Sequence, residues 1–386
     1  MKKIISILGS TGSIGLSTLS IVDKKKNLLT INFLAANKNY KLICKQILKY
    51  KPKYFIIKNK IIFNKVKQKF KNNKTIILND YKFKNPKKLD VIVSAIPGIE
   101  GLKPTLELIK ETKKILIANK ESIVCGWNLL KKEAIKNKTK IIPIDSEHFS
   151  ILKLLEKEDV KLIKKIYITA SGGPFLNFKK KQLLKIQPKD TLKHPKWKMG
   201  KKITVDSATL MNKMFEVVEA QKLFNIPISK LEILIHPESL VHAIISFNNG
   251  LIKFIYHETS MIIPIANAIL ERDLKIENFL KTKKRNLDII KDLTFQKVNS
   301  NIFPVIKLKT KINELPSSPI IFNAFNEILV DRFLKKKLSF LGISKTIMSV
   351  LNTRLYKKYA IRNPKNIKEI INIDNWARES ITKKLR

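Results

Sequence analysis

The chain has 386 residues, of which 77 are lysine or arginine and 31 are aspartate or glutamate, and its formal net charge at pH 7 is +46. This length can bury several hydrophobic cores, so we expect two or three domains. No apolar run approaches the roughly 18 residues that a membrane span needs, which argues against a membrane protein. Cys44 and Cys125 are too few for a disulfide framework and indicate a reducing compartment, which we take to be the cytoplasm.

The positive charge raises the possibility of a nucleic-acid role, but its distribution argues against a specific one. Lysine is spread along the whole chain with frequent isoleucine and asparagine, whereas arginine, the better reader of bases and phosphates, is scarce. A general drift of surface positions towards these residue types would give the same composition. We expect the charge to attract anionic small molecules, and we keep a basic nucleic-acid binder only as an alternative.

A buried-strand pattern at Ile4 to Leu8 leads into a glycine-rich turn over residues 9–15, and a helical pattern follows over 16–22. Glycines at 9, 12 and 15 allow a tight turn and a close approach of the backbone to a pyrophosphate, which the helix N-terminus then faces. Such a turn alone is weak evidence, but its place between a strand and a helix favours nucleotide binding.

The second strand pattern, residues 30–36, is followed by Asn37, Lys38 and Asn39. An NAD-binding chain usually carries an acidic residue here to hold the ribose hydroxyls, and none is present. A cationic, amide-rich loop suits a 2′-phosphate, so we predict NADP rather than NAD. The alternative is that Lys38 is simply one lysine among many.

Further strand patterns cover residues 54–57, 75–78, 90–96, 113–118 and 141–144. Because strands alternate with helices, we predict a Rossmann-like, doubly wound parallel sheet over residues 1–144. Asn119, Lys120 and Glu121 follow one of these strands, at the edge where the nicotinamide half of the cofactor would bind.

The last of these strands ends at Asp145-Ser146-Glu147-His148. Two carboxylates this close together repel each other unless a positive charge lies between them, and Mg²⁺ or Mn²⁺ prefers oxygen ligands. The alternative is a solvated turn in which Asp145 caps the next helix.

We predict a central α+β catalytic domain over residues 145–280. A strand at 165–170 opens into a lysine-rich segment, 171–200, which has glycines at both ends and resembles a mobile lid. Trp197 lies within it, either as part of the lid or as a simple anchor on the domain surface.

Within residues 203–219 we predict one helix, which Asp206 or Ser207 caps. Its apolar residues recur at helical spacing, and Asn212, Glu216 and Glu219 share another face beside Lys213. This polar face could supply a third carboxylate ligand and bind a phosphate, or it could be a solvated helix face. Strands are expected at 231–235, 241–247 and 251–256, a linker at 281–312, and a helical domain at 313–386.

Together these motifs resemble the 1-deoxy-D-xylulose 5-phosphate reductoisomerase family. The stretches that carry the resemblance keep the family's order: residues 9–15, 118–122, 145–148, 171–175, 194–200 and 205–216. The resemblance implies that the chain rearranges the carbon skeleton of a ketose phosphate and reduces the resulting aldehyde with NADPH, in the non-mevalonate route to isoprenoid precursors. It also implies a divalent metal and a homodimer.

The family pattern assigns roles to individual residues. Those implied on NADPH are Thr11, Gly12, Ser13, Ile14, Asn37, Lys38, Asn39, Asn119, Glu121 and Gly200. Those implied on Mg²⁺ or Mn²⁺ are Asp145, Glu147 and Glu216, which with Lys120 form the catalytic set. Those implied on the substrate are Lys120, Ser146, Glu147, Ser171, His194, Trp197, Met199, Ser207, Asn212, Lys213 and Glu216.

Three features depart from the family's pattern. Pro97 replaces a usual aliphatic residue in the loop after the strand at 90–96. Asn37 stands where the family usually has glycine, and residues 259–264 lack the acidic and basic residues that usually flank Met261. A different NADP enzyme of related layout, such as a homoserine or semialdehyde dehydrogenase, is the nearest alternative, but it would not need the three carboxylates and the lid.

Overall fold

The computed structural model describes residues 2–83, 87–194, 196–197, 199–271, 274–280 and 293–385. The chain forms two compact units, each of which is described by itself. The first unit comprises Met1–Ser122, Trp127–Phe149 and Ser260–Arg285, and the second comprises Ile123–Gly126, Ser150–Thr259 and Asn286–Arg386.

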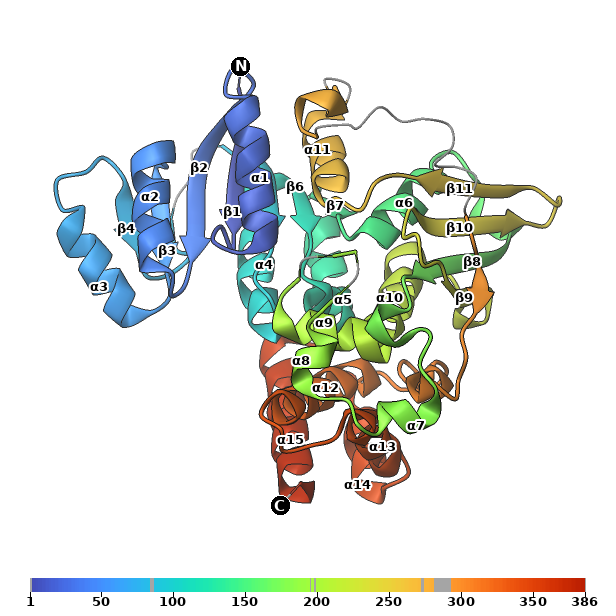
Figure 1. Cartoon of the computed structure of the whole chain (residues 1–386). Coiled ribbons are helices and arrows are strands. Elements are labelled where there is room, and N and C mark those ends of the chain that lie inside the picture. The colour runs from blue at the N-terminus through green and yellow to red at the C-terminus, as the bar shows by residue number, and fades with distance from the viewer. Residues whose placement is uncertain are drawn as a thin grey trace. The chain divides into compact units, whose positions relative to one another are not determined.

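The first unit is built on a seven-stranded sheet in the order β4-β3-β2-β1-β5-β6-β7, and every strand pair in it is parallel (Figure 1). The strands are β1 (Lys3–Leu8), β2 (Leu29–Ala36), β3 (Tyr54–Ile57), β4 (Ile76–Leu78), β5 (Leu89–Ser94), β6 (Thr112–Ile117) and β7 (Lys140–Pro143). The strand order reverses between β1 and β5, and such a switch point opens a crevice at the carboxyl ends of the strands. The predicted Rossmann-like parallel sheet is confirmed.

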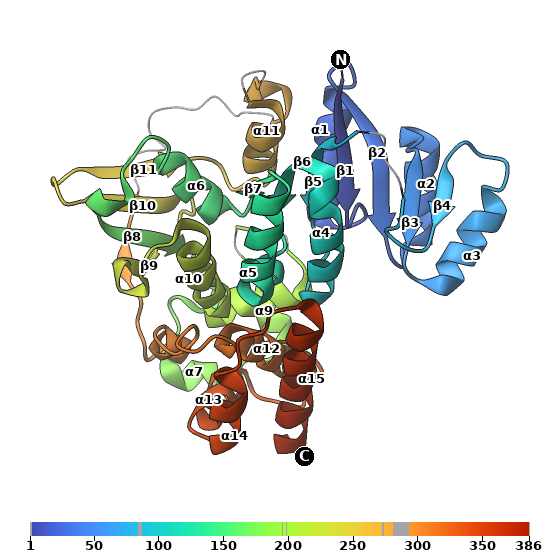
Figure 2. The same ribbon diagram turned by 180° about the vertical axis from the view of Figure 1, so that it is seen from behind.

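Helices cover both faces of this sheet. They are α1 (Ser13–Lys24), α2 (Tyr40–Tyr50), α3 (Lys60–Lys69), α4 (Leu102–Leu108), α5 (Lys120–Lys136) and α11 (Ile262–Leu270). Helices α1 and α11 pack together on one face (Figure 1), and α4 and α5 lie on the opposite face (Figure 2). The Lys3 Nζ donates a 2.7 Å hydrogen bond to the Ile269 carbonyl, which fastens α11 to the start of β1.

The second unit contains a five-stranded mixed sheet in the order β11-β10-β8-β9-β12. Its strands are β8 (Ile163–Ala170), β9 (Leu231–Ile235), β10 (Val241–Phe247), β11 (Ile252–Tyr256) and β12 (Gln296–Lys297). Only β8 and β9 run parallel among these described strands, and α10 (Met211–Phe224) packs against both of them. The strands expected at 165–170, 231–235, 241–247 and 251–256 are therefore confirmed.

The prediction of a single helix capped by Asp206 or Ser207 is wrong. Two helices occupy this region, α9 (Lys201–Thr209) and α10, and Leu210 joins them in a left-handed conformation with φ of 61°. Asp206 is an interior residue of α9 and is 2% exposed, because its side chain has partners elsewhere in this unit.

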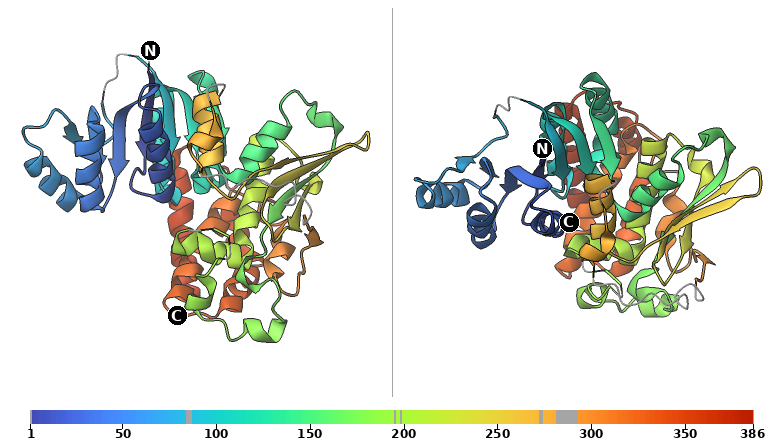
Figure 3. Two further views of the ribbon diagram at one scale, coloured as in Figure 1. Left: turned by 45° about the horizontal axis from the view of Figure 1, so that its top comes forward. Right: turned by 90° about the horizontal axis from the view of Figure 1, so that it is seen from above.

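The C-terminal helices are α12 (Ser318–Leu334), α13 (Phe340–Leu351), α14 (Arg354–Ala360) and α15 (Ile367–Lys384), and they gather to one side of the sheet of this unit (Figure 3). Helix α14 begins as a separate helix after α13, because the Thr353 side chain caps it by accepting from the Tyr356 N–H. A helical C-terminal region is confirmed. Of the predicted linker, residues 281–292 lie outside the described residues. Among the helices that the structure describes, none has the length and apolarity to cross a membrane.

Candidate active site

The glycine-rich turn follows β1 and leads directly into α1. Gly9 has φ of +87°, and a Cβ there would lie 2.5 Å from the Ala95 carbonyl oxygen, so only glycine fits. Gly12 is the N-cap residue of α1 and has no side chain, so it offers no side-chain acceptor to the first N–H groups of the helix. A helix N-terminus with donors of this kind suits a phosphate group.

The turn is held by a residue that sequence analysis missed. Gln46 of α2 is 3% exposed; its Oε1 accepts from the Ser10 Oγ at 2.7 Å, and its Nε2 donates to the Ser10 carbonyl at 2.9 Å. The loop after β2 lies beside this turn in the fold, since β1 and β2 are paired. There, Lys38 is exposed and Asn39 caps α2 by accepting from the Leu42 N–H at 3.1 Å.

Asn119, just after β6, forms hydrogen bonds with other residues of the chain. It is 4% exposed, its Oδ1 accepts from the Ser122 N–H at 2.6 Å to cap α5, and its Nδ2 donates to the carbonyls of Ile96 and of Gly98, the latter at 3.0 Å. The side chain therefore ties the loop after β5 to the loop after β6, at the edge of the sheet where a cofactor is expected.

The acidic motif lies where β7 passes into α6 (Ser146–Leu154). The Lys120 Nζ lies 3.1 Å from the Asp145 Oδ2, and the two side chains are 8% and 20% exposed. The Ser146 Oγ donates to the Glu147 Oε2 at 2.6 Å, and the His148 Nδ1 lies 3.8 Å from the Asp145 Oδ1. The first unit thus brings together two carboxylates and a buried lysine that offsets part of their charge.

Asp145 also contacts the start of α6, as expected from the alternative in which it caps this helix. Its Oδ1 accepts from the Glu147 N–H at 3.4 Å, and its carbonyl accepts from the Phe149 N–H at 2.8 Å. Capping uses one oxygen weakly, at the long end of the hydrogen-bond range, so it leaves this carboxylate able to bind a cation.

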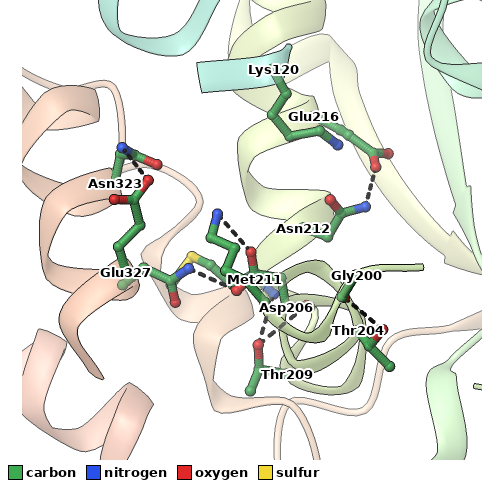
Figure 4. A network of polar contacts seen from close by, with 12 residues as sticks. Lys120, Gly200, Thr204, Asp206, Thr209, Met211, Asn212, Glu216, Asn323 and Glu327 are labelled. Atoms are coloured by element: carbon green, nitrogen blue, oxygen red, sulfur yellow. Dashed lines mark hydrogen bonds and ion pairs between the residues drawn. The ribbon is translucent and has the colours of Figure 1, made fainter. Parts of the chain in front are cut away.

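In the second unit, α10 presents the predicted polar face. Glu216 is 1% exposed; its Oε2 accepts from the Lys213 Nζ at 2.7 Å, and its Oε1 accepts from the Asn212 Nδ2 (Figure 4). A solvated helix face does not describe this arrangement, because the carboxylate and the lysine are both buried. The helix therefore holds a charged acid, an amide and a lysine in one cluster.

Ser171, His194 and Ser207 also meet in the second unit. The His194 Nε2 lies 3.1 Å from the Ser171 Oγ and 3.1 Å from the Ser207 Oγ. Its Nδ1 accepts from the backbone N–H groups of Lys196 and Trp197, at 3.1 and 2.9 Å. Because Nδ1 is an acceptor, the network assigns the ring proton to Nε2, which makes His194 a neutral donor that faces the two hydroxyls.

The electrostatics agree with this neutral form. Burial, and to a smaller extent the nearby Lys213 charge, lowers the pKa of His194 from 6.5 to about 4. Two hydroxyls, a neutral imidazole N–H, an amide and a lysine are donors that suit the oxygens of a phosphate.

The predicted lid segment contains η4 (Gly173–Phe175), α7 (Lys180–Leu183) and α8 (Pro188–Thr191). The Trp197 ring is half-buried and meets the His242 ring edge-on, with centroids 6.2 Å apart. This contact agrees with the anchor interpretation and is compatible with a lid. Pro195 and Lys198 of the same motif lie outside the described residues.

The chain matches models of one protein family along most of its length. Residues 5–126 match 1-deoxy-D-xylulose 5-phosphate reductoisomerase, residues 141–224 match the C-terminal domain of that name, and residues 257–380 match a further DXP reductoisomerase C-terminal domain. The chain is 46% identical over 387 residues to the 1-deoxy-D-xylulose 5-phosphate reductoisomerase of Pelagibacter ubique, with 97% of each chain covered. The chain belongs to the 1-deoxy-D-xylulose 5-phosphate reductoisomerase family.

Other members of this reductoisomerase family are also similar to the chain in sequence or in structure. The protein of that name from Clostridium novyi is 38% identical, with 99% of each chain covered. A solved DOX-P reductoisomerase in complex with NADPH, fosmidomycin and magnesium superposes with a TM-score of 0.90 at 30% identity, covering 99% of this chain and 98% of that one. The Zymomonas mobilis reductoisomerase in complex with NADPH gives a TM-score of 0.88 at 28% identity, with both chains fully covered. The resemblance predicted from the motifs is confirmed.

Proposed function

We propose that this chain converts 1-deoxy-D-xylulose 5-phosphate to 2-C-methyl-D-erythritol 4-phosphate, using NADPH and a divalent metal, in isoprenoid precursor biosynthesis. The observation that carries the proposal is family membership over nearly the whole chain, supported by a relative solved with NADPH and magnesium. The enzyme is accordingly an NADP-dependent oxidoreductase.

We assign the cofactor to the crevice at the carboxyl ends of the first unit's strands. Thr11, Gly12, Ser13 and Ile14 would hold the pyrophosphate at the start of α1. The residues assigned to the rest of NADPH are Asn37, Lys38, Asn39, Asn119, Glu121 and Gly200. The exposed Lys38 supports the choice of NADPH, because a 2′-phosphate needs a cation at this point of the fold.

We assign Mg²⁺ or Mn²⁺ to the carboxylates of Asp145, Glu147 and Glu216. An all-oxygen donor set fits these hard cations, and the buried Glu216 shows that the chain already keeps one of these acids out of water. When bound, the cation supplies Lewis-acid stabilisation of the oxyanion that develops on the substrate. Lys120 adds a positive charge beside Asp145 and would bind substrate oxygens with Ser146.

We assign the phosphate end of the substrate to Ser171, His194, Ser207, Asn212 and Lys213. Holding a phosphate at a distance from the reacting carbons supplies orientation for the rearrangement and the hydride transfer. Trp197 and Met199 would cover the carbon chain and exclude water, because the aldehyde intermediate must not escape before it is reduced.

We further propose a cytoplasmic homodimer in which residues 1–144 bind NADPH, residues 145–280 carry the catalytic site and residues 313–386 form a helical domain. The two free, buried cysteines support a reducing compartment. Light scattering of the purified protein would test the dimer, and a monomeric mass would refute it.

Product analysis tests the reaction directly. With 1-deoxy-D-xylulose 5-phosphate, NADPH and Mg²⁺, mass spectrometry should find a phosphorylated product that has gained two hydrogens. With homoserine and NADP in place of these reactants, no oxidation is expected. Oxidation of homoserine, with no conversion of 1-deoxy-D-xylulose 5-phosphate, would favour the dehydrogenase alternative.

A further inference from the structure

Asp206 is a buried acid of α9 to which the proposed reaction gives no role. Its Oδ2 lies 2.9 Å from the Lys202 Nζ, one turn earlier in α9, and its Oδ1 accepts from the Asn326 Nδ2 at 2.7 Å. Asn326 belongs to α12 and is fully buried. One side chain therefore joins α9 to a C-terminal helix that lies 120 residues further along the chain.

The residue that follows Asp206 faces the proposed phosphate site. Neighbouring helix positions point in directions about 100° apart, so Asp206 can face α12 while Ser207 faces another way. The Ser207 Oγ lies 3.1 Å from the His194 Nε2, as described above. The turn that carries Ser171 also rests on this helix, since a Cβ on Gly173 would lie 3.2 Å from the Ala208 Cα.

The backbone at Asp206 is also linked to the start of α10. Its carbonyl accepts from the Thr209 Oγ1 at 3.2 Å, and the same Oγ1 accepts from the Met211 N–H at 3.3 Å. These bonds brace the left-handed Leu210 that separates the two helices. Asn212 and Lys213 lie in the first turn of α10, so a shift of α9 would move them together with Ser207.

We propose that Asp206 and Asn326 are positioning residues for the phosphate end of the substrate, and that α12 is thereby part of the support of this site. The proposal rests on the proposed function. A buried carboxylate that loses a hydrogen-bond partner is destabilised unless it binds water or another donor. We expect α9 to shift or become less ordered, because such a movement would let the Asp206 carboxylate reach a new donor. The donors to the phosphate would then be misplaced without any of them being removed.

The test compares the wild type with Asn326→Leu, which has a similar size and no amide. We expect the KM for 1-deoxy-D-xylulose 5-phosphate and the inhibition constant of inorganic phosphate to rise about tenfold or more, because small misplacements of binding groups are costly. The dissociation constant of NADPH should stay within about twofold, since every residue assigned to the cofactor except Gly200 lies in the first unit. The kcat should fall less than the KM rises.

Glu327 provides a matched control on the same helix. It lies next to Asn326 in the sequence, pairs with Arg378 of α15 and accepts from the Asn323 Nδ2 of α12 at 3.2 Å, so its described partners belong to the C-terminal helices. Glu327→Gln should lower the melting temperature without raising the KM. If Asn326→Leu behaves like this control, with lowered melting and unchanged KM and phosphate inhibition, the positioning role is refuted.

A rescue experiment keeps the proposal testable if Asn326→Leu does not fold. The double variant Asp206→Asn with Asn326→Asp reverses the donor and the acceptor of the bond, and should recover a KM closer to that of the wild type than Asn326→Asp alone, which sets two acids against each other. No recovery in a folded double variant would overturn the proposal. A wild type that does not oxidise NADPH would instead refute the proposed function itself.

Discussion

The Lys213 Nζ lies 2.7 Å from the Glu216 Oε2, one turn apart on α10, and both side chains are buried. A buried ion pair is costly to break, because the partner that remains is left uncompensated in a medium of low dielectric constant. Lys213 is thus the ion-pair partner of the buried acid that we propose as a metal ligand. A cation at Glu216 would replace Lys213 as its partner and make this lysine available to the substrate phosphate, which links the two binding events.

Glu216→Gln should remove most of the activity and lower kcat by at least about a hundredfold. The reason is that one charge is taken from the proposed metal ligands while the shape of the side chain is kept. NADPH affinity, measured by fluorescence titration, should not change. Melting must be followed in parallel, since Lys213 loses its counter-charge and the loss of a buried partner costs about 3–5 kcal/mol. Near-normal turnover in this variant would mean that Glu216 is not a metal ligand.

Lys38→Glu should weaken NADPH much more than NADH, by about tenfold or more in the ratio of their KM values, because only NADPH carries the 2′-phosphate. Lys45→Glu is the matched control, since Lys45 is also an exposed lysine and lies within α2. Equal losses for the two cofactors, or equal effects of the two substitutions, would indicate only a general effect of charge.

Gly15→Ala should lower the stability of the protein much more than Gly12→Ala, although both glycines lie in the proposed nucleotide turn. A Cβ on Gly15 would lie 2.6 Å from the Ser10 Cα, so this change should destabilise the fold by about 1–3 kcal/mol in chemical denaturation. Gly12 is exposed, and its Cβ would lie 3.4 Å from the Gly9 carbonyl oxygen, so its cost should be about 0.5 kcal/mol or less. A stability loss that is as large in Gly12→Ala would contradict this view of the turn.

His194 should stay neutral well below pH 6. Its pKa in the folded protein is lowered to about 4, mainly by burial, so between pH 6.5 and 4 the unfolded chain binds a proton that the folded chain does not. The His194 contribution to folding stability should therefore be lost as the pH falls through this window. Proton NMR of the wild type, with His194→Gln to assign the signal, should give a midpoint near pH 4. A titration midpoint near pH 6.5 would show that the His194 ring is not buried as described.

The strands of the first sheet could be predicted because each is a short apolar run that ends at a turn signal, and residues such as Asn119 and Asp145 could be placed because they follow those runs. The roles of most site residues were implied by the resemblance to the family, because the motifs that carry the resemblance contain them. What the sequence could not show were contacts between distant segments, such as Gln46 with Ser10 and Asn326 with Asp206.

The mistaken helix start at Asp206 has the same cause. An aspartate followed by a serine before an apolar repeat is typical of a helix cap, but here Asp206 is held by Lys202 and by Asn326 of another helix. The true break falls at Leu210, and nothing local marks a leucine for the left-handed conformation. The tertiary contact of Asp206 with Asn326 and the local bonds of the Thr209 hydroxyl accompany this boundary, and no simple sequence pattern encodes the first of these.

The most direct test of the account is the loss of NADPH absorbance with 1-deoxy-D-xylulose 5-phosphate, measured with Mg²⁺ and again with a chelator. We predict oxidation that requires both the sugar phosphate and the metal. A folded protein that does not oxidise NADPH under these conditions, or that oxidises it equally well with the chelator present, would contradict the assignment of the three carboxylates and of the reaction.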